Sequence, residues 1–238
     1  MLYSPAMRPL SILETVEEHW LFMKAFGREV YNRNFQIGAM GPTCAAVRRA
    51  IFRQMPQGIR HVVNVGAGTG VMERDLGLRE NRKRTASLRR WDALEPDPEF
   101  ADFFRRTIDD PRVKFHQAYS SSLPNIIEPE SADMVIATVP KLPKEQQVEF
   151  SRQLFQFVRP GGIYLHAIFR DITKPMSKAT NVPRKDIGII PANGQWLPPR
   201  PYLLQIAKKN PSSKTYSLPS SQESAAPLQA DGAYTLQA

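Results

Sequence analysis

The stretch that decides the fold is His61-Val-Val-Asn-Val65, followed directly by Gly66-Ala-Gly68-Thr-Gly70. Its first five residues are mostly β-branched, which is typical of a buried strand. The glycines allow the backbone to turn sharply and to approach a ligand closely, because they carry no Cβ. Residues 71–76 then show a helical pattern. A strand, a glycine-rich turn and a helix in this order predict the first unit of an α/β sheet.

Further short β-branched runs follow at regular intervals along the chain. Strands are predicted over 92–94, 113–116, 134–137 and 163–168, the last introduced by the turn Arg159-Pro-Gly-Gly162. Helical periodicity separates them, most clearly over 97–108 and 144–158. This alternation predicts a doubly wound, mostly parallel sheet. A late apolar run over 202–207 is predicted to add a strand that closes one edge.

Two helices are predicted ahead of the sheet. Apolar residues recur at steps of three and four from Ile12 to Val30. One interpretation is a helix packed on the core; the other is a mobile or membrane-facing lid, because residues 20–26 make the apolar face broad. The second helix follows Thr43, which can cap it, and its arginines are expected to point away from the apolar face into solvent: Arg48, Arg49 and Arg53.

Composition bounds the organisation of the chain. With 238 residues, 42% of them apolar and 23% charged, the sequence predicts a globular protein with a sizeable core. Residues 211–238 are rich in Ser, Pro, Ala and Gln and are predicted to be a disordered tail. The predicted division is therefore an N-terminal helical lid or membrane-facing region over 1–58, a catalytic domain over 59–210 and the tail.

The charge and the remaining residue types restrict the setting. The net charge of +9 indicates an anionic partner, either a nucleic acid or an anionic lipid surface. No apolar run approaches the roughly 18 to 20 residues that cross a bilayer, and Glu14, Glu17 and Glu18 interrupt any signal peptide. Cys44 is the single cysteine and the four histidines have no metal-ligand spacing, so a cytoplasmic setting without a metal site is expected.

The glycine loop and one acidic residue carry the first chemical hypothesis. A nicotinamide-binding fingerprint of the form G-x-G-x-x-G would need glycine at position 71, where the chain has Val71. The loop is therefore of the form G-x-G-x-G. Glu95 ends the second predicted strand, where an acidic residue can accept hydrogen bonds from both ribose hydroxyls of an adenosine-containing ligand.

Four segments resemble the class I S-adenosylmethionine-dependent methyltransferases: 63–70, 93–95, 133–137 and 159–162. The resemblance implies a Rossmann-like sheet that binds S-adenosyl-L-methionine. Asn64 departs from the family, which usually has an acid there, and Gln117 departs where an Asp is frequent. The cofactor-binding residues that the resemblance implies are Asn64, Gly66, Ala67, Gly68, Gly70, Glu95, Pro96, Gln117, Ala118 and Thr138.

Three further segments, 36–43, 136–142 and 196–202, look like the bacterial phospholipid N-methyltransferases, whose layout is similar to that of the ribosomal RNA adenine dimethylases. This resemblance implies an N-methyltransferase that acts on a phosphatidylethanolamine-type amine at the inner face of an anionic membrane. The loop over 138–142 is then expected to frame the acceptor. Lys141 is the candidate for its phosphate, and Tyr31 is a second candidate contact.

Two other functions stay open. An RNA base methyltransferase would agree with the charge, but such enzymes typically place an aromatic ring after the fourth strand to stack on the base, and Thr138-Val-Pro-Lys141 has none. A non-catalytic binding protein with the same fold is suggested by Asn64 and Gln117. Nucleic acid is therefore the less favoured partner and the membrane the favoured one.

Overall fold

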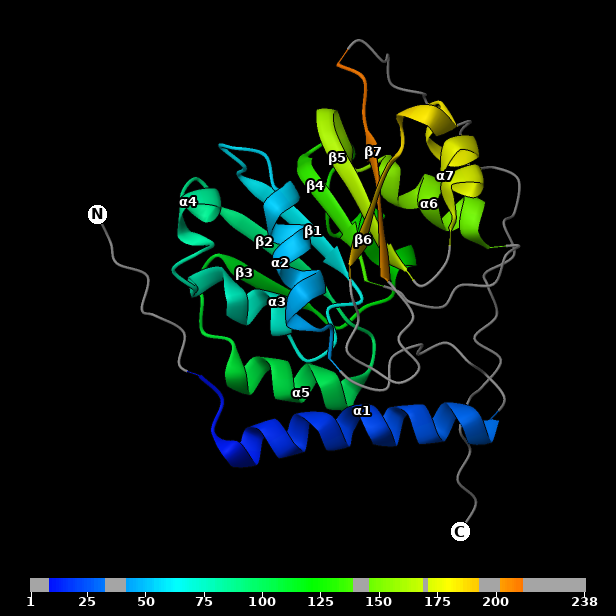
Figure 1. The fold of residues 1–238 in the computed structure, drawn as a ribbon. Helices are drawn as coiled ribbons and strands as arrows, with labels where there is room; N and C mark the ends of the chain where they lie inside the picture. Colours follow the sequence, from blue (N-terminus) through cyan, green and yellow to red (C-terminus); the bar gives the residue numbers. More distant parts are fainter. Residues whose placement is uncertain (1–8, 33–41, 139–145, 169–170, 193–201, 212–238) are drawn as a thin grey trace.

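The computed structural model describes residues 9–32, 42–138, 146–168, 171–192 and 202–211. Its centre is a seven-stranded sheet with the order β3-β2-β1-β4-β5-β7-β6 (Figure 1). Neighbouring strands from β3 to β5 pair in parallel, whereas β7 is antiparallel to both of its neighbours. The doubly wound, mostly parallel α/β fold is thus confirmed. The strands are β1 (His61–Val65), β2 (Arg90–Leu94), β3 (Val113–His116), β4 (Ala132–Ala137), β5 (Val158–Ile168), β6 (Gly188–Ala192) and β7 (Tyr202–Lys208).

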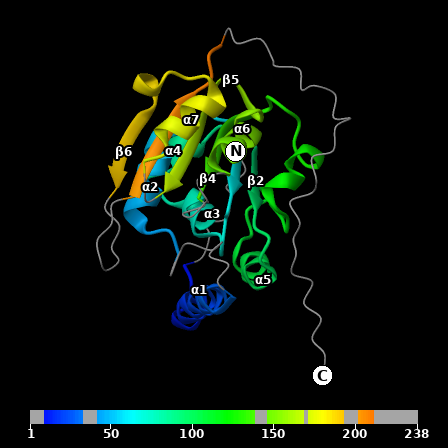
Figure 2. The same cartoon turned by 90° about the vertical axis from the view of Figure 1, so that its right-hand side faces the viewer.

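Helices cover both faces of the sheet (Figures 1 and 2). One apolar cluster joins the sheet to α2, α3, η1 and α5; the other joins it to η2, α6 and α7. The helix α1 lies beneath one end of the sheet, alongside α5. The helical elements are α1 (Ile12–Asn32), α2 (Ala45–Gln54), α3 (Val71–Arg74), η1 (Asp75–Gly77), α4 (Arg82–Thr85), α5 (Pro98–Thr107), η2 (Ser120–Asn125), α6 (Gln147–Phe155), α7 (Thr173–Thr180) and η3 (Arg184–Asp186).

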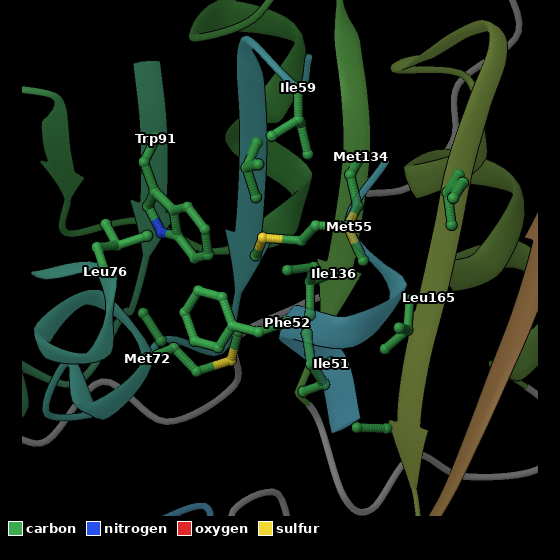
Figure 3. Close-up of a cluster of buried hydrophobic side chains, with 14 of the residues drawn as sticks. Ile51, Phe52, Met55, Ile59, Met72, Leu76, Trp91, Met134, Ile136 and Leu165 are labelled. Carbon is green, nitrogen blue, oxygen red and sulfur yellow. The ribbon is translucent and has the colours of Figure 1, made fainter. Parts of the chain in front are cut away.

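The first apolar cluster forms the centre of the molecule. Phe52 from α2 stacks against Trp91 from β2, with ring centroids 6.4 Å apart (Figure 3). Both side chains are at most 1% exposed. Burying large aromatic groups of this kind is the main source of stability in a domain core. The helix α2 is therefore part of the same core as the sheet.

The parallel register places the candidate site at one edge. Val65 is paired with Leu94 on β2 and with Ala137 on β4. The residues that follow these three strand ends therefore emerge side by side. They are the glycine loop after β1, Glu95 after β2 and Thr138 after β4.

Four details differ from the sequence-based expectations. The strand over 202–207 exists, but it lies between β5 and β6 and is not an edge strand. The edge is β6, which the sequence did not predict because it contains Pro191, a residue that edge strands tolerate. Cys44 instead of Thr43 occupies the N-cap of α2, and no side chain caps it. Arg48 is not solvated, because it is half-buried and paired with Asp75 at 2.6 Å.

The start of β5 leads to a prediction about stability. A Cβ added at Gly162 would lie 2.8 Å from the backbone oxygen of Asp133, closer than real Cβ contacts. Gly162→Ala is therefore expected to lower the free energy of unfolding by roughly 1 to 3 kcal/mol, because the two strands must separate. Gly188→Ala on β6 is the control, since its Cβ would meet nothing closer than 3.7 Å. Equal denaturation midpoints for the two variants would contradict this expectation.

Candidate nucleotide-cofactor site

The glycine loop has a backbone that favours glycine at three positions. Gly66, Gly68 and Gly70 have φ angles of 80°, 57° and 82°. The N–H groups of Gly66 and Ala67 both donate to the Leu94 carbonyl at 3.0 Å, which ties the loop to the end of β2. At Gly70 a side chain is excluded by space as well, because a Cβ would lie 2.7 Å from the Phe104 ring.

Glu95 holds the other side of this loop. Its Oε2 accepts a hydrogen bond from the Gly68 N–H at 2.9 Å, and its Oε1 accepts one from the Asp97 N–H at 3.0 Å. Burial raises the pKa of Glu95 to about 7, although the two backbone hydrogen bonds act in the opposite direction. An ionised carboxylate has about four acceptor positions, so two remain for the hydroxyls of a ribose.

Thr138 fixes the loop from the side of β4. Its N–H donates to the Val65 carbonyl at 2.9 Å, and its hydroxyl donates to the Gly66 carbonyl at 2.6 Å. The glycine loop is therefore tied to the ends of both strands that flank β1: Glu95 ties it to β2, and Thr138 ties it to β4. This rigidity supports a binding role, because a preorganised site loses less entropy when a ligand binds.

Helix α1 covers the loop with residues that the sequence analysis did not assign to the site. The Phe22 ring lies 3.3 Å from where a Gly68 Cβ would be, and its centroid is 4.7 Å from that of Phe100 on α5. Glu18 is 4% exposed and binds the Thr69 hydroxyl and the Arg74 guanidinium. The available signal was the spacing of Glu18, Phe22 and Ala25, which share one helix face.

Helix α1 therefore departs from a simple packed helix, because most of its periodic apolar residues face outward and not toward the core. Ala25 and Phe22 are buried, whereas the apolar residues with the clearest periodicity are exposed: Ile12, Val16, Trp20 and Met23. Ion pairs hold the polar flanks of α1 to α5. Arg28 pairs with Asp97 at 2.8 Å, Arg106 pairs with Glu17 at 2.6 Å, and Lys24 pairs with Glu99.

Asn64 is directed into the core beside the loop. Its Nδ2 donates to Glu73 Oε1 at 2.8 Å, and the Trp91 indole donates to the same oxygen at 2.8 Å. Burial raises the pKa of Glu73, which is completely enclosed. The acidic residue that the sequence resemblance leads one to expect at position 64 is thus replaced by an amide, which contacts the Glu73 carboxyl from α3. The predicted contact between Asn64 and a cofactor stays a prediction.

The other predicted cofactor residues differ in their surroundings. Gln117 is exposed, and its Oε1 accepts a hydrogen bond from Arg105 at 3.0 Å. Pro96 and Ala118 are half-buried near the ends of β2 and β3. Tyr31 belongs to the last turn of α1, but its side chain lies outside the described residues, as does the whole of Lys141. The two predicted catalytic contacts therefore stay predictions.

The described histidines near the sheet are engaged elsewhere. His61 and His116 each donate a hydrogen bond from Nε2 to the Asp92 carboxylate at 2.7 Å. Burial acts to raise the pKa of Asp92, but these contacts and Arg90 hold it well below its usual range. His166 is buried on β5, where its Nδ1 is 3.2 Å from the Tyr164 hydroxyl. None of these three is an open general base at the glycine loop in the part of the chain that the structure describes.

The site fits an adenosine-containing cofactor on its own chemistry. A glycine-lined loop gives close backbone approach, and a carboxylate at the end of the adjacent strand can accept from ribose hydroxyls. The ring of Phe22, which packs against that of Phe100, supplies apolar surface beside Gly68. Gly66, Gly68, Gly70 and Glu95 would hold the nucleoside, and α1 would limit the access of water.

No protein-family model and no curated protein sequence matches this chain. Among solved structures, the chain is similar to spermidine synthase from Thermotoga maritima, with a TM-score of 0.54 and 16% identity over 69% of this chain. It spans 60% of that protein's length. A putative S-adenosylmethionine-dependent methyltransferase from Listeria monocytogenes gives a TM-score of 0.51 and 13% identity, covering 70% of this chain and 98% of that one.

A third similar structure is the S-adenosylmethionine-dependent methyltransferase SibL in its apo form, with a TM-score of 0.50 and 18% identity. The match covers 68% of this chain and 54% of SibL. At these identities the similarity establishes the fold. The chain therefore has the fold of the class I S-adenosylmethionine-dependent methyltransferases, which spermidine synthase shares.

The raised pKa of Glu95 predicts a pH-dependent affinity for S-adenosylhomocysteine. An ionised carboxylate would accept from both ribose hydroxyls and the neutral acid would do so poorly, so affinity is expected to rise as the pH increases through about 7. Glu95→Gln keeps one acceptor, which can serve the Gly68 N–H, but it loses the charge and the acceptor for the Asp97 N–H. Calorimetry between about pH 6 and 8 should show roughly tenfold weaker binding by this variant at the upper end and a flatter profile. An identical pH profile in both proteins would exclude Glu95 as the ribose acceptor.

Proposed function

We propose that the protein is an S-adenosylmethionine-dependent N-methyltransferase whose acceptor is the amine of a phospholipid headgroup of the phosphatidylethanolamine type. One observation supports the lipid acceptor above the others. The helix that packs on the glycine loop carries an exposed apolar stripe on its outer face, made of Ile12, Leu13, Val16, Trp20 and Met23. Exposed apolar surface of this extent favours a membrane or protein contact.

The position of the stripe fits a reaction at an interface. Phe22 and Glu18 bring α1 onto the loop, and the stripe lies on the opposite side of the same helix. A bilayer that received the stripe would therefore lie against the end of the sheet at which the cofactor is proposed to bind. Among the described residues, no helix is long and apolar enough to cross a membrane. The proposed association is peripheral, at the cytoplasmic face.

The chemistry asks the chain mainly for orientation. S-adenosylmethionine would supply a methyl group on a good leaving group, and an amine held in line would take that methyl as S-adenosylhomocysteine leaves. Glu95 and the glycine loop would orient the nucleoside, and Thr138 leads from β4 into the segment proposed to frame the acceptor. Lys141, and Arg200 from the segment over 196–202, are proposed to meet the lipid phosphate as charge-assisted partners; both lie outside the described residues. The cationic amine must lose a proton before it attacks.

The test of the acceptor is a labelling experiment with the full chain. Methyl-labelled S-adenosylmethionine is offered with vesicles that contain phosphatidylethanolamine, with RNA, and with small amines in separate reactions. We expect label in the lipid alone, and less of that label in the Glu95→Gln variant when the cofactor is below saturation. Label in RNA and none in lipid would overturn the lipid acceptor. No transfer to any pool despite tight cofactor binding would favour a non-catalytic protein.

The contribution of α1 to membrane association predicts a separate result. Replacing Val16 and Trp20 by serine should weaken sedimentation with vesicles by at least about tenfold, because these side chains then gain little from leaving water. Binding of S-adenosylhomocysteine should be unchanged, since both residues point away from the loop. The matched control replaces two other exposed apolar residues, Leu78 and Ile189, by serine. Equal sedimentation of both double variants would refute the role of α1.

A further inference from the structure

The arginines of the protein divide into two groups by their partners. Ten arginines of the described residues form an ion pair with a carboxylate: Arg28, Arg48, Arg74, Arg90, Arg105, Arg106, Arg112, Arg152, Arg159 and Arg184. The described arginines outside those pairs all fall between positions 49 and 89: Arg49, Arg53, Arg60, Arg79, Arg82, Arg84 and Arg89. The described arginines without an ion pair are therefore concentrated in one part of the sequence.

The fold brings these residues together. The Arg84 guanidinium donates to the Met55 carbonyl at 3.0 Å, which joins α4 to the end of α2. The Arg89 N–H donates to the Arg60 carbonyl at 2.8 Å, so the entrances to β1 and β2 are adjacent. Glu80 is the one exposed acid within residues 49–90. We name the exposed set the amino-end basic surface; it consists of Arg49, Arg53, Arg60, Arg79, Arg82, Lys83 and Arg89.

This surface is separated from the candidate cofactor site. Arg60 and Arg89 stand immediately before β1 and β2, whereas the glycine loop and Glu95 follow the same strands. Parallel strands of five residues are about 16 Å long. Figures 1 and 2 agree in placing α1 at the opposite end from α4. The amino-end basic surface is therefore not the wall of the acceptor site.

The distance also separates it from the membrane contact proposed for α1. A bilayer against the outer face of α1 would be farther away by the diameter of that helix, about 10 Å. The sum of roughly 26 Å exceeds three Debye lengths at physiological salt, which are about 8 Å each. An anionic bilayer bound by α1 would therefore attract the residues around Arg60 and Arg89 only weakly. A different anionic partner would therefore be needed to contact these basic residues.

The chemistry of the surface favours a phosphate backbone over a protein. Protein interfaces need buried apolar or aromatic anchors, and Leu78 is the one large apolar residue that the structure exposes in this region. Guanidinium groups, by contrast, match phosphate oxygens with two parallel hydrogen bonds. No aromatic side chain between residues 49 and 90 is exposed, so stacking on bases is not provided for.

We infer that the amino-end basic surface binds the phosphodiester backbone of a nucleic acid, without selecting bases or sugar. Affinity then comes from phosphate contacts and counterion release, which are independent of sequence. This binding is distinct from the proposed methyl transfer and does not require RNA to be the methyl acceptor. The protein would hold a nucleic acid at one end of the sheet and act on its acceptor at the other.

The test uses the full chain and fluorescent oligouridylate RNA and oligothymidylate DNA of equal length. Anisotropy should give equal affinities for the two probes. The patch variant carries Arg82→Gln, Lys83→Gln and Arg89→Gln, and it should bind at least about tenfold more weakly near 0.1 M salt. The slope of log affinity against log salt should fall by roughly 0.7 for each lost contact, about 2 in total.

A matched control separates a local surface from net charge. Lys174→Gln, Lys178→Gln and Lys185→Gln remove the same charge from exposed positions on and after α7. Their combination should bind both probes like the intact protein, and circular dichroism should give native spectra for both triple variants. Equal weakening in the two variants, or no binding by the intact protein at low salt, would overturn the inference. So would a patch variant that loses anionic vesicles but keeps the nucleic acids.

The test of nucleic-acid binding can be interpreted separately from the test of the proposed function. Lipid methylation is measured in a separate reaction and should be unchanged in the patch variant, because none of its three positions lies at the glycine loop. Retained methylation with lost nucleic-acid binding supports both statements. Lost methylation with retained nucleic-acid binding contradicts the separation of the two surfaces.

Discussion

The hydrogen bond from the Gly68 N–H to the Glu95 carboxylate is the contact on which the organisation of this end of the molecule depends. It joins the loop after β1 to the end of β2, and the parallel register of the two strands makes it possible. The same carboxylate accepts from the N–H of Asp97, whose side chain caps α5. Glu95 thus fixes the position of the glycine loop and of the start of α5. Phe100 on α5 packs in turn against Phe22, which holds α1 in place.

Helix α1 distributes its side chains in the opposite way to an ordinary surface helix. It buries a carboxylate, Glu18, and leaves its largest apolar side chain, Trp20, 65% exposed. The buried carboxylate is tolerated because Arg74 and Thr69 bind it; without partners it would cost several kcal/mol. The exposed apolar stripe contributes little to folding. Because folding stability does not account for this exposed apolar stripe, a contact with another apolar surface is the favoured explanation for it.

The sequence was informative where local patterns set the structure. The glycine loop, Glu95 and the parallel strands follow from β-branched runs and turn residues that need no distant partner. The seat of α1 could not be predicted, because Glu18 reads as a surface acid until Thr69 and Arg74 are brought beside it. The same holds for Arg48, whose partner Asp75 is 27 residues away. Pro191 concealed β6, since proline argues against a strand unless that strand is known to be an edge.

The distribution of charge limits how a net charge of +9 can be interpreted. Around the glycine loop, α1 and α5 neutralise each other through Arg28, Lys24 and Arg106. A ligand that enters there meets paired charges and apolar rings, not a strongly positive field. Arg60 and Arg89, which form no ion pair with a described residue, stand at the entrances to β1 and β2, at the opposite end of the sheet. Net charge is therefore a poor guide to what binds at the glycine loop, where a ligand would be recognised by shape, apolar contact and a few local polar groups.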